Sequence, residues 1–490
     1  MDAEILAWFT RQGGTYDAER FGLSQFPGQG RGAIALTDIP EDHTLFSIPR
    51  DLTLSLRTSS LPASFGLGAW KSGGLSTGWA GLMLCMMWEE SKSSESKWSV
   101  YFQSMPSTFS TPMFWNEQEI EELEGTAVVD KIGRQDAEKD YHERVLPALQ
   151  SRPDLFPPHL LDVHFTLERY HMMGSRILSR SFTVENWDSA DDDEEEEEFN
   201  EMDVDSSPSR GQQDQNAQRE AKDGEEKFHD EVAEEDEDEE DPSDVAMVPM
   251  ADILNARYGS ENAKLFYEKH TLRMVSTKPI SAGEQIWNTY GDPPNSDLLR
   301  RYGHVDQVPL PQGDVGNPAD IVEIRADLVV STANSQADQE RIDWWLEEGG
   351  DDTFILDNDF DLPETMISLI KLVQLPSADW EKAKQKGKPP KPKVDAGVLA
   401  VIVDVLNKRL AQYGTSVQED TELLSTRTDL TDNHKNAVVV RLGEKRILSI
   451  VLEQQQQQLQ AMQSHVTDVK RKRGAESSTC STHTAKKGKR

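Results

Sequence analysis

The stretch QIWNTYGDPPNSDLLRRYGH, residues 285–304, spells Tyr-Gly twice, and its two tyrosines, Tyr290 and Tyr302, are twelve residues apart. Apolar and polar residues alternate over 285–290, which is typical of a half-buried strand. Tyr290 is therefore predicted to end a strand, immediately before a glycine.

The residues that follow this strand predict a turn and a short helix. Pro293-Pro294 cannot continue a strand, whereas Asn295 or the serine after it can cap a helix. Gly303 can end that helix in a left-handed conformation. A strand, a turn and a short helix in this order return the second phenol close to the first. Two half-buried packing tyrosines with solvated hydroxyls are the alternative that these residues leave open.

The length and the charge of the chain limit its class. At 490 residues it has enough material for two or three domains. The formal net charge is −37, and residues 188–241 hold 27 acids against 4 bases, so most of the acidity is local. This sign disfavours direct binding of nucleic acid and favours a basic protein as substrate or client.

The two cysteines, Cys85 and Cys480, are too few for a disulfide framework or a zinc cluster, which suits a reducing compartment. Acids stand near the N-terminus where a signal peptide would carry bases. The longest apolar run, residues 79–88, is about half of a membrane span, so no membrane segment is expected.

The expected fold class is α+β. Short strands are predicted in two blocks that flank a helical insertion, so one β-rich domain is split and is followed by an all-α C-terminal domain. An acidic tract of low hydrophobicity should be disordered. The expected boundaries are 1–78 for an N-terminal helix and the first β half, 79–187 for the helical insertion, 188–244 for the acidic insert, 245–305 for the second β half, 306–460 for the helical domain and 461–490 for a basic disordered tail.

That tail carries two basic clusters, at 470–473 and 486–490, whose spacing resembles a two-part nuclear import signal. Nuclear localisation is therefore expected, with a cytoplasmic pool and a merely solvated basic tail left open.

Four separated pieces resemble one family when they are taken in order. They are FPGQGRGAIAL at 26–36, SRSF at 179–182, MVPMADILN at 247–255 and the doubled Tyr-Gly stretch. Together they resemble the SET-domain protein-lysine methyltransferases, in the branch that contains the Rubisco large-subunit methyltransferase and the fungal ribosomal lysine methyltransferases. The resemblance covers nearly all of residues 1–455 and implies a split SET domain with a C-terminal substrate-binding domain.

The resemblance also implies the chemistry. The cofactor would be S-adenosyl-L-methionine, and the partner would be a protein that bears the target lysine, expected to be a basic ribosomal protein. Tyr290 would be the catalytic phenol, which holds the lysine amine in line with the methyl group, a task of positioning that requires no metal. Tyr302 would shape the methyl passage on the cofactor side.

The remaining site residues are also implied by the resemblance. Gly30, Arg31 and Gly32 would let the backbone approach the cofactor closely. Arg180 would contact the carboxylate of the cofactor, and Asn255 would pair with its amino end. Ala256 stands where the family usually has His, and it would contact adenine through its backbone. The residues expected to line the substrate groove are Trp79, Ser181, Thr183, Asp252 and Tyr290.

Three alternatives remain open at this stage. The first is a degenerate SET fold that serves as a non-catalytic binding module; Ala256, which stands in place of the usual His, leaves this alternative open. An acidic chaperone for basic proteins would rest on the 188–241 tract. Histidine methylation of actin on the same fold is the third, although the motifs favour lysine. A monomer is expected.

Overall fold

The computed structural model describes residues 2–185, 242–311, 313–333 and 339–479. The acidic insert expected at 188–244 lies outside these residues, apart from the short turn Pro242–Asp244. The second basic cluster, 486–490, also lies outside them.

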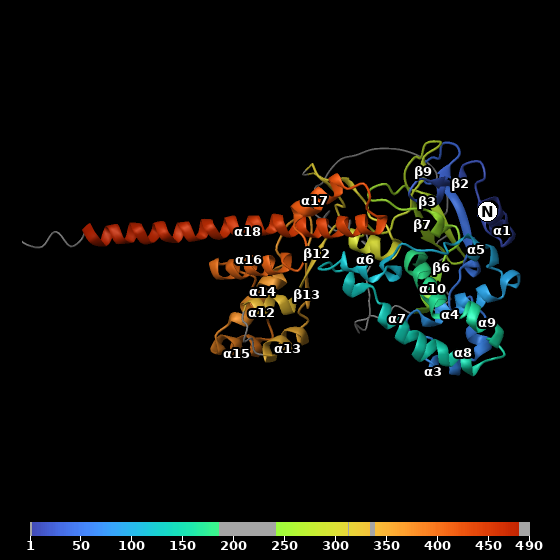
Figure 1. The fold of residues 1–490 in the computed structure, drawn as a ribbon, viewed down its shortest axis with the longest axis horizontal. Helices are drawn as coiled ribbons and strands as arrows, with labels where there is room; N and C mark the ends of the chain where they lie inside the picture. Colours follow the sequence, from blue (N-terminus) through green and yellow to red (C-terminus); the bar gives the residue numbers. More distant parts are fainter. Residues whose placement is uncertain (1, 186–241, 312, 334–338, 480–490) are drawn as a thin grey trace, which may run out of the picture.

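Two antiparallel sheets form the β-rich domain (Figure 1). The larger sheet has the strand order β1-β4-β8-β7, and the second sheet has the order β2-β3-β9. A two-stranded ribbon, β5-β6, stands beside them. The strands are β1 (Thr15–Tyr16), β2 (Phe21–Phe26), β3 (Gly30–Ala35), β4 (Thr44–Pro49), β5 (Ser181–Thr183), β6 (Val245–Met247), β7 (Ala263–Tyr267), β8 (Thr271–Ser276) and β9 (Gln285–Ile286).

Each of these sheets combines strands from both ends of the insertion. Phe46 of β4 pairs with Met274 of β8, and Ala33 of β3 pairs with Ile286 of β9. In both pairs the side chains are buried. The two β blocks therefore form one domain, and the chain leaves that domain and returns to it.

The helical insertion packs on the sheets without a core of its own. Leu84 and Tyr170, from two of its helices, belong to the same buried apolar cluster as Phe46 and Met274. The N-terminal helix α1 (Asp2–Arg11) joins this cluster through Ile5. The other helices of this region are α2 (Leu61–Phe65), α3 (Leu67–Ser72), α4 (Ala80–Ser91), α5 (Ser99–Ser104), α6 (Glu117–Glu121), α7 (Arg134–Asp140), α8 (Leu146–Ser151), α9 (Pro158–His164) and α10 (Leu167–Arg180).

The C-terminal region has a separate core, in which Trp344, Leu369 and Ile402 are buried together. Its helices are α12 (Ala326–Ala333), α13 (Gln339–Glu347), α14 (Glu364–Gln374), α15 (Ser377–Lys386), α16 (Ala396–Leu410), α17 (Val417–Thr426) and α18 (Asp432–Thr479). These elements confirm the α+β class that the sequence predicts.

The prediction that this region is all-α is wrong, because two small antiparallel pairs occur in it. They are β10 (Val308–Pro309) with β11 (Val315–Gly316), and β12 (Val322–Arg325) with β13 (Thr353–Leu356). In the second pair Val322 and Ile324 face the core. The two strands are short and two helices separate them in the chain, so no hairpin turn signals them in the sequence.

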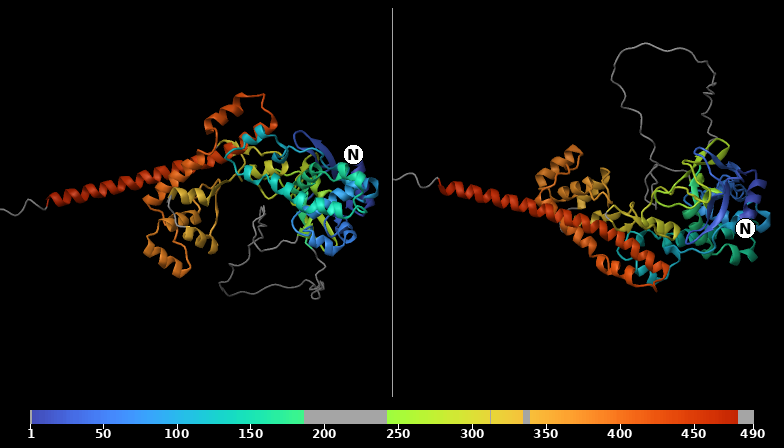
Figure 2. Two further views of the ribbon diagram at one scale, coloured as in Figure 1. Left: turned by 60° about the horizontal axis from the view of Figure 1, so that its bottom comes forward. Right: turned by 90° about the horizontal axis from the view of Figure 1, so that it is seen from above.

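Helix α18 corrects the expected boundary of the tail. It continues to Thr479, so residues 461–479 are helical, although they are expected to be disordered. Gln, Lys, Arg, Glu and Ala, which favour helix, make up 8 of these 19 residues, and none of the 19 is a proline. Figure 2 shows the helix projecting beyond the rest of the molecule. Within the described residues, no helix is both long and apolar enough to cross a membrane.

Candidate active site

The rings of Tyr290 and Tyr302 stack on each other, with centroids 4.3 Å apart and planes 5° apart. The predicted proximity of the two phenols is therefore confirmed. Gly291 and Gly303, which follow them, have φ values of +78° and +76°, a region that favours glycine. Each glycine thus adopts a left-handed conformation directly after its tyrosine, and Gly303 also ends the helical turn that carries Tyr302.

The prediction that Tyr290 ends a strand is wrong, and the short helix before Tyr302 also differs from the expectation. Strand β9 ends at Ile286, and the path to Tyr290 is held by other bonds, such as the one from the N–H of Asn288 to the carbonyl of Asn255 (2.9 Å). The short helix consists of α11 (Asn295–Asp297) and a π-helical turn, Leu298–Tyr302. Asn295 does not cap this helix, because its side chain bonds elsewhere.

The hydroxyl of Tyr290 points towards the backbone of the segment that follows Asp252. It donates a weak hydrogen bond of 3.4 Å to the carbonyl of Leu254. Burial raises the pKa of Tyr290 to about 12; Arg180 opposes this shift and Asp252 adds to it. The phenol therefore stays protonated at any ordinary pH.

Tyr302 and His304 extend the aromatic group. Burial raises the pKa of Tyr302, and the neighbouring Tyr290 adds to the shift. The His304 ring lies 5.9 Å from the Tyr302 ring, and burial lowers its pKa. His304 is therefore held neutral beside Tyr302. His304 directly follows the second Tyr-Gly pair in the sequence, yet it was not predicted as part of the site.

Asp252 is buried at the junction of the insertion and the second β block. Its Oδ2 accepts a hydrogen bond from the hydroxyl of Tyr101 (2.9 Å), and its backbone carbonyl accepts one from Nη1 of Arg180 (2.6 Å). Within the described residues, Oδ1 of Asp252 and Nε of Arg180 have no partner. Burial raises the pKa of Asp252, although Arg180 and Tyr101 oppose the shift. Tyr101 was missed because nothing in its helical context marks it.

Gly32 is in contact with two side-chain amides. A Cβ at this position would lie 2.6 Å from Nδ2 of Asn255 and 3.0 Å from Nε2 of Gln285. Neither amide nitrogen has a hydrogen-bond partner within the part of the chain that the structure describes. Two unpaired donors therefore converge where glycine leaves room for them. Gln285 was not predicted, since a Gln at the start of a strand carries no signal of its own.

The other two residues of the Gly-Arg-Gly motif have different surroundings. Gly30 has a φ of +74° at the start of β3, with open space where a Cβ would be. The guanidinium of Arg31 donates to the carbonyl of Ser104 (2.5 Å) and lies 3.7 Å from Asp2. Arg31 therefore fastens β3 to the helices beside it.

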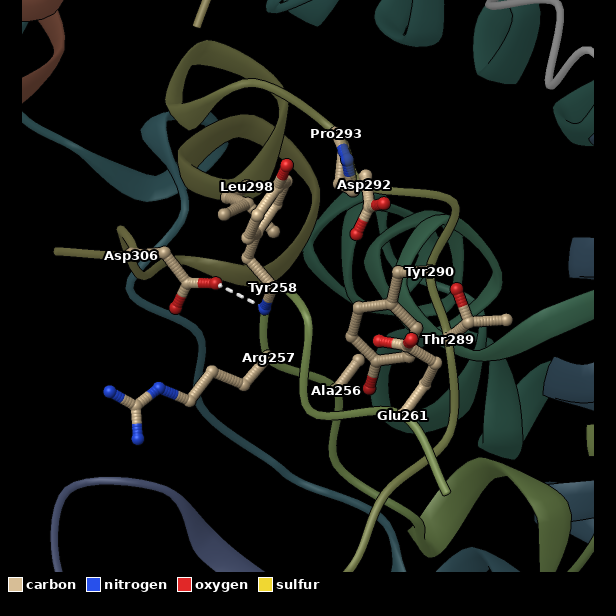
Figure 3. A pocket seen from close by; sticks show the side chains of 10 residues that line it. All are labelled: Ala256, Arg257, Tyr258, Glu261, Thr289, Tyr290, Asp292, Pro293, Leu298 and Asp306. Atoms are coloured by element: carbon tan, nitrogen blue, oxygen red, sulfur yellow. Dashed lines mark hydrogen bonds between the residues drawn. The ribbon is translucent and has the colours of Figure 1, made fainter. Parts of the chain in front are cut away.

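Ala256 and Tyr290 line one small cavity, which Figure 3 shows from close by. The backbone of Ala256 pairs with Asn288 in an isolated parallel bridge, so the segment after Asn255 runs beside the residues that follow β9. The other lining residues, none of them predicted, are Arg257, Tyr258, Glu261, Thr289, Asp292, Pro293, Leu298 and Asp306.

Three of those lining residues are carboxylates, Glu261, Asp292 and Asp306. Burial raises the pKa of Asp292, and the other two acids raise it further. Asp306 accepts a hydrogen bond from the N–H of Tyr258 (3.0 Å), which is the dashed line in Figure 3. The cavity beside Tyr290 therefore has a negative wall.

The residues predicted to line a substrate groove are placed in two regions. Ser181 and Thr183 are in β5 and pair with Met247 and Val245 of β6, directly after Arg180. Trp79 is separate: its ring is 36% exposed at the start of α4, and within the described residues no hydrogen bond or ring contact joins it to the Tyr290 group.

Comparisons with known proteins agree with this geometry. Residues 333–448 match the family model described as Rubisco LSMT substrate-binding. The chain is 32% identical over 281 residues to ribosomal lysine N-methyltransferase 4 of Saccharomyces cerevisiae, which covers 57% of this chain and 49% of the yeast protein, about half of its length. It is 26% identical to N-lysine methyltransferase SETD6 of Rattus norvegicus, over 92% of this chain and 90% of the rat protein.

The fold matches two solved structures. One is the SET domain of LSMT bound to MeLysine and AdoHcy, with a TM-score of 0.63 and 17% identity over 94% of this chain and 92% of the other. The second is Rubisco LSMT bound to AdoMet, with a TM-score of 0.62, 18% identity and the same coverage. The split sheets thus have the fold of the SET domain in these solved structures. In sequence, the chain is similar over most of its length to the N-lysine methyltransferase SETD6, and its C-terminal region matches the Rubisco LSMT substrate-binding family.

Proposed function

We propose that this chain uses S-adenosyl-L-methionine to methylate the ε-amine of a lysine in a ribosomal protein. The observation that carries the proposal is the stacked, protonated Tyr290, four residues after β9, beside buried polar groups that lack partners within the described residues. The ribosomal substrate rests on the likeness to the yeast enzyme.

The residues near Gly32 and Asp252 fit the proposed cofactor. The free amides of Asn255 and Gln285 can donate to its acceptor groups, and the absence of a Cβ on Gly32 keeps the space between them open. Oδ1 of Asp252 can accept from its amino group, and Arg180 offers Nε to its carboxylate. When bound, the cofactor supplies a methyl group on a sulfonium centre.

Tyr290 is suited to hold the amine. Its hydroxyl proton is directed at the carbonyl of Leu254, so the lone pairs of the phenol oxygen can accept an N–H of the lysine. One N–H held in this way fixes the direction of the lone pair on the amine. Tyr302 packs flat on the ring and prevents it from turning. Such positioning is a recognised source of rate enhancement that requires no proton transfer by the phenol.

The lysine must be neutral before it reacts. At its reference pKa of ~10.4, about one lysine in 2,500 is neutral at pH 7. Desolvation beside the buried Tyr290 hydroxyl favours the neutral form of the amine. The acids at the cavity wall, Glu261, Asp292 and Asp306, act earlier, because their charge attracts a basic substrate to the mouth.

The test is to incubate the purified full-length chain with methyl-labelled cofactor and ribosomal fractions, and then to map the label by mass spectrometry. Label on a lysine of one ribosomal protein supports the proposal. Label on lysines of other proteins only would overturn the ribosomal substrate and keep the activity. A chain that binds the cofactor and labels nothing would favour the alternative of a non-catalytic binding module.

A further inference from the structure

Asn295 is a fully buried polar residue that the proposed reaction does not use. It lies five residues after Tyr290 and seven before Tyr302. Its Oδ1 accepts from the N–H of Asp306 (2.7 Å), and its Nδ2 donates to the carbonyl of Asp306 (3.1 Å). Its own N–H donates to Oδ1 of Asp320 (2.8 Å). The segment between the two phenols is therefore fixed from two directions.

Asp320 belongs to the linker, residues 303–321, that joins the π-helical turn to β12 of the C-terminal domain. It is 6% exposed, and it faces Gly443 of α18 so closely that a Cβ there would overlap its Oδ2. A second linker residue, Asn317, donates from Nδ2 to the carbonyl of Pro293 (2.9 Å). The turn after Tyr290 is thus bonded to the linker, and the linker is packed against α18.

Helix α18 also supports the element that carries Tyr302. Ala437 and Val440 of the helix share a small buried cluster with Leu299. Nδ2 of Asn436 donates to the carbonyl of Gly303 at 3.5 Å. One face of α18 therefore lies along the π-helical turn from its start to its end.

We propose that Asp320 is a positioning residue for methyl transfer. It accepts a hydrogen bond from the N–H of Asn295 and packs against Gly443 of α18, and in this way it fixes the stack of Tyr290 on Tyr302. This proposal rests on the proposed methyltransferase function. It makes the first turns of α18 part of the catalytic support, in addition to any contact that the C-terminal domain makes with a substrate.

Asp320 acts here as a hydrogen-bond acceptor. Burial raises its pKa to about 7, while the amide N–H groups of Asn295 and Asn317 and the charge of Arg446 oppose the shift. The other charged group that faces it is Glu444, also on α18. Since either protonation state keeps an oxygen for the N–H of Asn295, Asn at position 320 should preserve the contact and Ala should not.

Four variants of the full chain test this role. Asp320→Ala removes the hydrogen-bond acceptor, and Asp320→Asn keeps one. Gly443→Ala leaves the Asp320 side chain unchanged chemically, but its new Cβ displaces the carboxylate. Asp314→Ala is the matched control, since this acid is in the same linker, its side chain is 61% exposed, and within the described residues that side chain pairs with Arg446 alone, at 3.9 Å.

The measurements are kcat and KM for methyl transfer from labelled cofactor to ribosomal fractions, and the amide hydrogen exchange of residues 293–303. Asp320→Ala and Gly443→Ala should lower kcat by at least about tenfold, since a misplacement of ~1 Å can cost about 100-fold, and should change KM less. In both variants, amide hydrogen exchange of residues 293–303 should be faster than in the wild type. Exchange of residues 398–406 in α16 should be unchanged. Asp320→Asn should remain within about threefold of wild-type kcat, because the main hydrogen bond is kept.

Wild-type kcat and wild-type exchange in both Asp320→Ala and Gly443→Ala would overturn the proposal, as would an equal loss of kcat in Asp314→Ala. If Asp320→Ala also exchanges faster at 398–406, its fold is lost and Gly443→Ala decides. A wild-type chain that methylates nothing would overturn the proposed function, whereas the exchange of 293–303 would still decide whether Asp320 fixes this segment.

Discussion

The hydroxyl of Tyr101 donates a 2.9 Å hydrogen bond to Oδ2 of Asp252, a residue 151 positions further along the chain. Both side chains are buried. A helix of the insertion thus supplies a partner for a carboxylate that the second β block places near Tyr290. The insertion is therefore part of the support of the site.

Tyr101→Phe should lower the free energy of unfolding by about 1–3 kcal/mol, because one oxygen of a buried carboxyl loses its hydrogen-bond donor. Tyr16→Phe is the control: Tyr16 is half-buried, and no hydrogen bond of its hydroxyl is found within the described residues, so the change should stay within about 0.5 kcal/mol. Urea denaturation measures both. Equal effects in the two variants would contradict the role of the Tyr101 hydroxyl.

Tyr290→Phe should lower methyl transfer by at least ~100-fold and leave the fold intact, since the ring still stacks on Tyr302 and one hydroxyl is lost. Binding of S-adenosyl-L-methionine, measured by calorimetry, should remain close to that of the wild type. Turnover near the wild-type value would remove Tyr290 from the catalytic role.

Gly32→Ala should weaken cofactor binding, because the new Cβ would lie 2.6 Å from Nδ2 of Asn255 and push the amide aside. Asn255→Ala should produce the same defect by removing the amide. The control is Gly68→Ala in α3, where a Cβ meets nothing within 4 Å. Calorimetric affinities decide: if Gly32→Ala and Gly68→Ala bind equally well, the close approach at Gly32 is not needed.

The rate at low substrate concentration should rise about tenfold per pH unit from pH 7 to pH 9, because the neutral fraction of a lysine with pKa ~10.4 rises by that factor. The pKa of Tyr290 is raised to about 12, so its phenol stays protonated over this range and causes no fall in rate. A pH profile of kcat/KM to pH 10 is the measurement. A descending limb near pH 9 would show that Tyr290 ionises far below that value.

The basic tail should carry nuclear import, and removal of residues 466–490 should leave turnover unchanged. The reason is the pair of basic clusters in the sequence. Fluorescence microscopy of tagged full-length and truncated chains is the measurement, with labelled-methyl turnover as the control. Nuclear accumulation of the truncated chain would dismiss this assignment.

Local sequence rules were sufficient for the stacked phenols. Pro293-Pro294 cannot continue a strand, and Gly303 ends the helical turn with a positive φ, so Tyr302 returned to Tyr290. These rules act within about twenty residues. They do not depend on how distant parts of the chain pack.

The supports of the site could not be predicted in that way. Tyr101, Gln285 and Asp320 are single polar residues in ordinary contexts, and each acquires its role from a partner that only the tertiary fold brings near. The short strands β12 and β13 were missed for the same reason, since they find each other across two intervening helices. Long-range pairing leaves little trace in a single sequence.

The length of α18 has a practical use. Its 48 residues span about 70 Å at 1.5 Å per residue, and its first turns pack beside Leu299. A fluorophore or surface anchor attached at its far end would therefore stand well away from the cavity beside Tyr290. The chain can be immobilised or optically labelled through this helix, which would act as a built-in spacer.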